Sequence, residues 1–162
     1  MIAFLFAAAL AVPASAADFA VSAPAGWSVD SSTGGTSFTR PAAKNAGAAT
    51  IFVSFRIPAE GEPTDPEALA KKRLAPDPLL GIPMGWTRSK NIRVAGRDAV
   101  VLDRRFRTPD RHAAKRPWLA EREVVVPGAG GYYVLSLIGP EASREADRKA
   151  LRRALDGFTP AR

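Results

Sequence analysis

Cysteine is absent from this 162-residue sequence, and histidine occurs only once. The lack of cysteine excludes disulfides, thiol chemistry, cysteine-ligated zinc and iron–sulfur clusters. With His112 as the single histidine, neither a Ser-His-Asp triad nor a site of several histidine ligands is expected. The cationic neighbours of His112 repel both protons and metal ions, so we interpret it as an exposed loop residue. The sequence therefore predicts no metal and no cofactor.

Charge is absent from the first seventeen residues. An apolar run over 2–12 is broken by Pro13, and Ala14-Ser15-Ala16 provides the small residues that a signal peptidase recognises. The run is shorter than the ~20 apolar residues that a membrane-spanning helix needs. We therefore expect 1–16 to be a signal peptide cleaved after Ala16, 17–162 to be a single domain, and the protein to be secreted or periplasmic.

Positive charge is concentrated in one part of the chain. Residues 88–122 contain eleven Lys or Arg and four Asp or Glu, so this segment carries +7, the net charge of the whole protein. Guanidinium groups donate paired hydrogen bonds to phosphates and carboxylates. The part of this segment over 104–116 is our first candidate site, with the alternative that it is a solvated surface. Its cations are Arg104, Arg105, Arg107, Arg111, Lys115 and Arg116.

The hydrophobic patterns predict strands and two helices. Residues 49–57 alternate between apolar and polar side chains, which is typical of a half-buried strand. A proline-led helix is expected over 66–74, capped by Thr64 or Asp65, and an amphipathic helix over 143–158. The hairpin-like strands between and before them predict an α+β fold, with an antiparallel sheet of about six strands and the helices packed on it. The other expected strands cover 19–22, 27–29, 36–39, 90–94, 99–106, 118–126 and 132–138.

Several short motifs resemble the PsbP-like family, which also includes the DcrB-like bacterial envelope proteins and the Ran-binding Mog proteins. The matching residues are Pro24, Gly26 and Trp27, then Ile92, Val94, Gly96 and Ala99, the strand 132–137, and finally Leu155, Gly157 and Phe158. The resemblance covers most of 17–162. It implies an α/β/α sandwich and a binding or accessory role, and it supplies no shared catalytic residue.

A second candidate site is the segment 79–86 of the irregular loop 75–86, which is unusually apolar for a loop. Leu80, Met84 and Trp86 are placed to line a groove for an apolar ligand or a segment of a partner. The alternative is that the loop folds over the sheet and contributes to the core. Paired acids such as Glu121 and Glu123 suggest a third possibility, a small hydrolase, but nearby arginines favour cross-strand salt bridges.

We therefore interpret the chain as an exported binding protein that is not an enzyme. Its expected partner is an acidic protein, an anionic component of the envelope or an apolar peptide segment, with peripheral contact to the membrane. Nucleic acid is not expected outside the cytoplasm, and we expect a monomer or a weak oligomer. The alternatives are a chaperone-like or inhibitor protein that captures an apolar segment, and the small hydrolase.

Overall fold

The protein is described by a computed structural model that covers residues 19–32, 34–42, 47–77, 79, 81, 84–107 and 117–161. Two α-helices are present in these ranges, α1 (Pro66–Leu74) and α2 (Arg144–Asp156), and the short 3-10 helix η1 (Glu141–Ser143) precedes α2. The strands are β1 (Phe19–Ala20), β2 (Ser28–Ser32), β3 (Gly35–Arg40), β4 (Ala49–Arg56), β5 (Trp86–Arg88), β6 (Ile92–Val94), β7 (Arg97–Arg107), β8 (Trp118–Gly128), β9 (Gly131–Pro140) and β10 (Thr159–Pro160).

Eight of the strands form one antiparallel sheet. Its order is β2-β3-β4-β9-β8-β7-β5, and β6 also pairs with β7. Strands β1 and β10 form a separate two-stranded ribbon. The predicted α+β class is confirmed, whereas the expectation of about six strands is wrong. One reason is β5, which begins at Trp86 and therefore lies where the proline- and glycine-rich sequence predicted the end of a loop.

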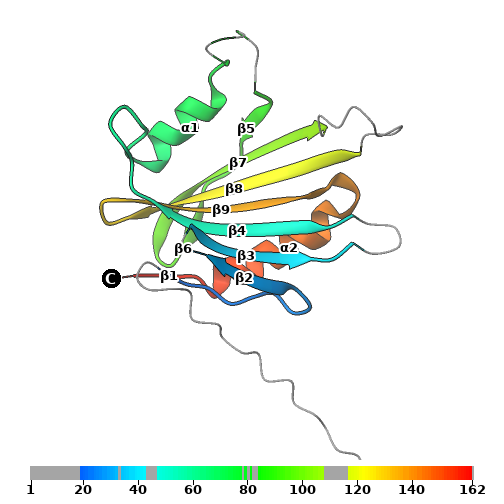
Figure 1. Ribbon diagram of the computed structural model, residues 1–162. Coiled ribbons are helices and arrows are strands. Elements are labelled where there is room, and N and C mark those ends of the chain that lie inside the picture. The colour runs from blue at the N-terminus through cyan, green and yellow to red at the C-terminus, as the bar shows by residue number, and fades with distance from the viewer. Residues whose placement is uncertain are drawn as a thin grey trace, which may run out of the picture.

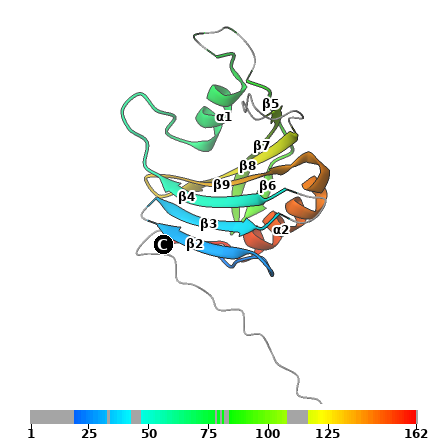
Figure 2. The same ribbon diagram turned by 45° about the vertical axis from the view of Figure 1, so that its right-hand side comes forward.

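The two helices cover opposite faces of the sheet (Figure 1). Alternate residues of β8 show this arrangement, because Val125 packs in a cluster with Leu69 of α1. Its neighbours Val124 and Val126 belong to the main core with Leu151 of α2. Turning the molecule confirms that α1 lies beside β5 and β7, while α2 lies on the other side of β8 and β9 (Figure 2). We call these two sides the α1 face and the α2 face.

Local sequence explains both helices. The Asp65 carboxylate accepts a hydrogen bond from the Ala68 amide at 2.8 Å, so Asp65 is the N-cap of α1, one of the two residues predicted for that role. Helix α2 has a buried stripe that contains Ala150, Leu151 and Ala154. One turn earlier in the helix the small apolar Ala146 is exposed, whereas its neighbour Asp147 is buried.

Candidate functional site

The structure divides the predicted arginine cluster between the two faces of the sheet. In β7, Arg104 shares the α1 face with Leu102, whereas Arg105 and Arg107 point to the α2 face. The guanidinium carbons of Arg105 and Arg107 lie 5.3 and 4.5 Å from the ring centre of Trp118. The remaining predicted residues of both sites, Arg111, Lys115, Arg116 and Leu80, lie outside the described residues, as does His112.

On the α1 face, Trp86 is part of a packed cluster. Its side chain is 7% exposed and packs with Ala70, Val100 and Leu102. The guanidinium groups of Arg73 and Arg104 lie 5.4 and 4.6 Å from its ring centre. Trp86 therefore contributes to the core, which is the alternative interpretation of the apolar loop, while Met84 and Leu79 are 44% and 92% exposed.

Two buried glutamates lie beside this tryptophan. Glu121 pairs with Arg104 and accepts a hydrogen bond from the Ser136 hydroxyl at 3.2 Å, and Glu123 pairs with Arg73 at 3.0 Å. Burial raises the pKa of Glu123 above its ordinary value, although the charge of Arg73 opposes this rise. Both carboxylates have an arginine partner. The predicted cross-strand salt bridge is present at Glu121, whereas the partner of Glu123 lies on helix α1 and not on a neighbouring strand.

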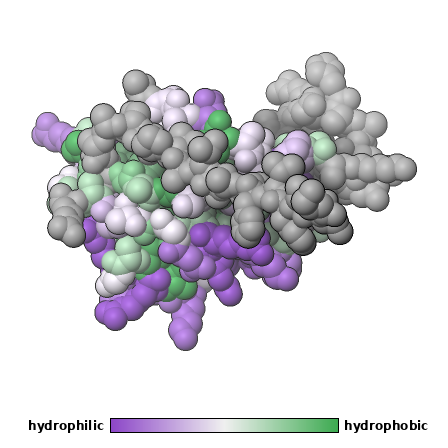
Figure 3. Space-filling model, turned by 90° about the horizontal axis from the view of Figure 1, so that it is seen from below, coloured by the Kyte–Doolittle hydropathy of each residue, from purple (hydrophilic) through white to green (hydrophobic). Residues whose placement is uncertain are grey.

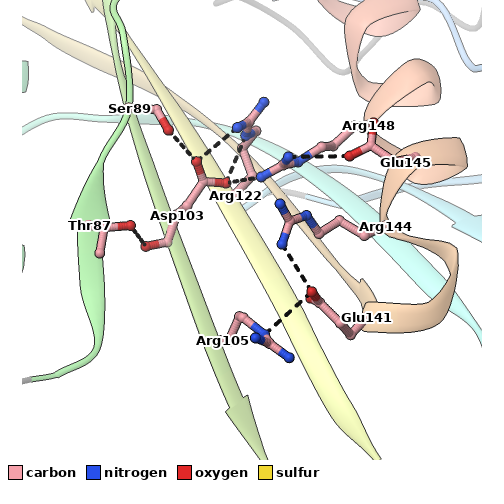
Figure 4. A network of polar contacts seen from close by, with 9 residues as sticks. All are labelled: Thr87, Ser89, Asp103, Arg105, Arg122, Glu141, Arg144, Glu145 and Arg148. Carbon is pink, nitrogen blue, oxygen red and sulfur yellow. Dashed lines mark hydrogen bonds and ion pairs between the residues drawn. The ribbon is translucent and has the colours of Figure 1, made fainter.

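The α2 face carries a cavity of about 440 Å³ between the N-terminal end of α2 and strands β5, β7, β8 and β9. We call it the arginine pocket. Five arginines line it. Arg104 of β7 directs its guanidinium group to Trp86 on the α1 face, and the other four are Arg105 of β7, Arg122 of β8, and Arg144 and Arg148 of α2. Their guanidinium groups converge on the same region (Figure 4).

Asp103 is the central acid of the arginine pocket. Its carboxylate accepts two hydrogen bonds from Arg122, at 2.9 and 2.8 Å, one from Arg148 at 2.8 Å, and one from the Ser89 hydroxyl at 2.5 Å. Burial alone would raise the pKa of Asp103. The hydrogen bonds from Arg122, Ser89 and Arg148, together with the charge of Arg122, outweigh burial and lower the pKa to about 2. Asp103 is therefore ionised at physiological pH.

The carboxylate of Glu141, like that of Asp103, contacts two arginines of the pocket. One oxygen of Glu141 lies 3.0 Å from Arg144 and 3.4 Å from Arg105 (Figure 4). Each of the two carboxylates thus contacts two guanidinium groups. Four positive charges face two negative ones in this network, and the exposed Glu145, 3.5 Å from Arg148, offsets the excess only partly. The acids Asp103, Glu121 and Asp147 also line the pocket, but its five arginines leave an excess of positive charge, and such an excess in a cleft favours binding of anions.

A second cavity, of about 850 Å³, continues along α2 toward β6. It shares Ser89, Arg122 and Arg148 with the arginine pocket, so the two cavities adjoin each other along α2. We call the whole feature the basic groove. A view from below shows hydrophilic residues gathered along one side of the molecule, next to an apolar area (Figure 3).

Sequence reasoning found only part of this site. Arg105 is both a predicted site residue and part of the pocket, whereas Arg122, Arg144 and Arg148 are not among the predicted site residues. One available signal was the spacing of Arg144, Arg148 and Arg152, since residues four apart lie on one side of a helix. The packing of that side against β7 and β8 is tertiary information.

The described residues contain no group of three or more His, Asp or Glu side chains able to hold a metal ion. None of the helices in the described ranges is long and apolar enough to cross a membrane.

Comparison with known proteins identifies relatives by fold alone. The sequence matches no protein-family profile and no curated protein. Several solved structures are similar, among them the following three. PA94 of Pseudomonas aeruginosa, a protein of unknown function, is 19% identical over 84% of this chain and 85% of its own, with a TM-score of 0.55. LpqN of Mycobacterium tuberculosis, involved in cell envelope biogenesis, is 19% identical over 89% of this chain and 83% of its own, with a TM-score of 0.52.

The third structure, from Bacteroides thetaiotaomicron, is 11% identical over 89% of this chain and 45% of its own, with a TM-score of 0.53. At these identities the comparisons establish a shared fold and no shared function. None of the three is named as a PsbP-like, DcrB-like or Mog protein, so that resemblance stays a prediction.

Proposed function

We propose that the protein is an exported, non-catalytic accessory protein of the cell envelope that binds an anionic ligand or an acidic partner in the arginine pocket. One observation supports this proposal most directly: the carboxylates of Asp103 and Glu141 each contact two arginines. Two acids therefore face four arginines, which leaves the pocket with excess positive charge. Guanidinium groups fixed in this way are suited to phosphate or carboxylate.

The placement in the envelope is part of the same proposal. It is supported by the signal-like sequence over 1–16 and by the fold shared with LpqN, a protein involved in cell envelope biogenesis in its own organism. The PsbP-like resemblance, whose members act mostly as binding or accessory proteins, agrees with a binding role. We also propose that the protein is not an enzyme, because Asp103, Glu121, Glu123 and Asp147 are each held by arginine in ion pairs.

Titration of the purified protein with citrate and inorganic phosphate at low ionic strength tests this proposal. We expect binding to weaken at least fivefold in Arg105→Ala and in Arg144→Ala. Arg56→Ala is the control, because Arg56 is an exposed arginine at the end of β4 on the other face of the sheet and its removal changes the net charge equally. Equal binding by control and pocket variants, or no binding by the unaltered protein, would overturn the proposal.

A second candidate function is capture of an apolar segment of another exported protein. The observation that favours it is the exposure of Leu79 and Met84, which are large apolar side chains in the loop before β5. The burial of Trp86 weighs against it, because the largest side chain of the candidate groove is already packed against α1 and β7. Loss of partner binding in Leu79→Ser/Met84→Ser, with no loss in Arg144→Ala, would favour this alternative.

A further inference from the structure

We infer that the basic groove binds an extended peptide segment that carries acidic residues at alternate positions. This inference rests on the proposed function, because the arginine pocket forms one end of the groove. Nine cations and five acids line the two adjoining cavities, an excess of four positive charges. The charge of the groove therefore calls for an acidic partner.

The arginines of α2 set the spacing of that partner. Arg144, Arg148 and Arg152 all line the groove and stand four residues apart. Four residues of α-helix rise about 6 Å. Two residues of an extended chain advance about 6.6 Å. Side chains at alternate positions of a strand point to the same side, so three acids at positions i, i+2 and i+4 would meet the three arginines in turn.

The other rim of the groove is also basic. It is formed by Arg105 at the pocket end, Lys90 in the connection between β5 and β6, and Arg93 in β6. Two acids also line the second cavity, Glu145 and Asp156. Glu145 contacts Arg148 at 3.5 Å and is exposed, so it can be displaced from that arginine.

The shape of the groove distinguishes a peptide from other anionic partners. A flat bilayer surface cannot reach arginines on the floor of a depression such as Arg122, which lines both cavities. Helix α2 has thirteen residues and is about 20 Å long, which matches about six residues of extended peptide.

Three labelled peptides of equal length test the inference by fluorescence anisotropy at low ionic strength. The first alternates Asp and Thr, the second contains the same residues with all Asp in one block, and the third replaces Asp with Asn. We expect the alternating peptide to bind at least fivefold more tightly than the blocked one, and the Asn peptide to bind much more weakly than both. This result would show that the spacing of the acidic residues contributes to the affinity in addition to the total charge of the peptide.

The matched variants are Arg152→Ala and Arg153→Ala. Both residues are exposed arginines of α2, but only Arg152 lines the groove. We expect Arg152→Ala to weaken binding of the alternating peptide at least threefold and Arg153→Ala to leave it unchanged. Unfolding measurements on both variants check that each one folds, and a variant that does not fold is replaced by the milder Arg152→Gln and Arg153→Gln pair.

Equal affinity for the alternating and blocked peptides, or equal losses in the two variants, would overturn the inference. Citrate and phosphate binding that still depends on Arg105 and Arg144 would then leave the proposed function standing. If, in addition, citrate and phosphate binding did not depend on Arg105 and Arg144, both the inference and the proposed function would be overturned. Stronger binding to phosphatidylglycerol vesicles than to the alternating peptide, with the same dependence on Arg152, would assign the groove to a lipid surface instead.

Discussion

Arg40 and Asp147 form a two-point ion pair that joins β3 to α2. The Nε and one terminal nitrogen of Arg40 lie 2.9 and 3.2 Å from the two carboxylate oxygens, and the Asp147 side chain is 2% exposed. The Ser143 hydroxyl donates a third hydrogen bond to this carboxylate at 2.7 Å. The pair connects elements 107 positions apart in the sequence and fixes α2 over the sheet, so it also positions the arginines of the pocket.

The Arg40→Ala variant should be destabilised by about 3 kcal/mol, because removing one partner leaves a buried carboxylate without its countercharge. Urea unfolding of both proteins measures this difference. The control is Arg93→Ala, whose pair with Asp98 is more than three-quarters exposed on both sides. We expect that change to cost less than about 0.5 kcal/mol. A loss below about 1 kcal/mol in Arg40→Ala would show that the buried pair does not hold α2.

The loss of folding stability at acidic pH should depend on Asp103. Its pKa falls from 3.8 to about 2 in the folded protein, so it stabilises the fold above pH 4 and this contribution is lost as the pH falls toward 2. The effect amounts to up to about 2 kcal/mol. Melting temperatures measured from pH 6 to pH 2 should decline less steeply for Asp103→Asn than for the unaltered protein. Parallel curves would mean that the contacts of Asp103 with Arg122 and Arg148 do not lower its pKa.

Glu123 should show the opposite dependence on pH. Burial raises its pKa above 4.5, so the folded protein binds the Glu123 proton more tightly than the unfolded chain does. This proton therefore stabilises the fold at acidic pH, and its contribution is lost as the pH rises through the folded pKa. We expect Glu123→Gln to be more stable at neutral pH by up to about 1 kcal/mol. Arg73 is partly exposed and can turn to solvent when its partner is removed. The measurement is urea unfolding at pH 4 and pH 7.5, and a destabilised variant at pH 7.5 would contradict the prediction.

Gly139 is a point where β9 lies close to both β4 and α2. A β-carbon at this position would lie 2.8 Å from the β-carbon of Ala49 and 3.0 Å from a carboxylate oxygen of Asp147. We expect Gly139→Ala to be destabilised by about 1–3 kcal/mol, because the strands or the buried ion pair must shift. The Gly34→Ala variant serves for comparison, since its nearest such contact is 4.0 Å away. Equal melting temperatures of the two variants would show that the sheet adjusts freely.

The alternation of β4 and β7 could be predicted from the sequence because the chemistry of a half-buried strand repeats every two residues. That pattern already placed Arg104 with Leu102 on one face and Arg105 on the other. The buried position of Asp147 could not be predicted, because a charged residue on an apolar stripe is interpretable only when its partner is known. Arg40 is in a different strand, and the polar pattern of β3 gives no sign that it reaches α2.

The arginine pocket was inaccessible to sequence reasoning for a similar reason. Its residues come from strands and a helix that meet only in the folded chain, and charge counting drew attention to 104–116 because cations are adjacent there. Part of that segment lies outside the described residues. The strand β5 was missed because three residues beside Gly85 give too short a pattern to identify.

The carboxylates of Asp103 and Glu141 act as resident competitors for the arginines around them. An incoming ion binds only if it interacts with the arginines more favourably than these two carboxylates do. A monovalent ion such as chloride or acetate interacts less favourably than a carboxylate that the chain already holds in place. A ligand with several negative charges gains from many guanidinium contacts at once while losing the freedom of only one molecule. The pocket should therefore select ligands by the number of their negative charges, and monovalent salt should not saturate it.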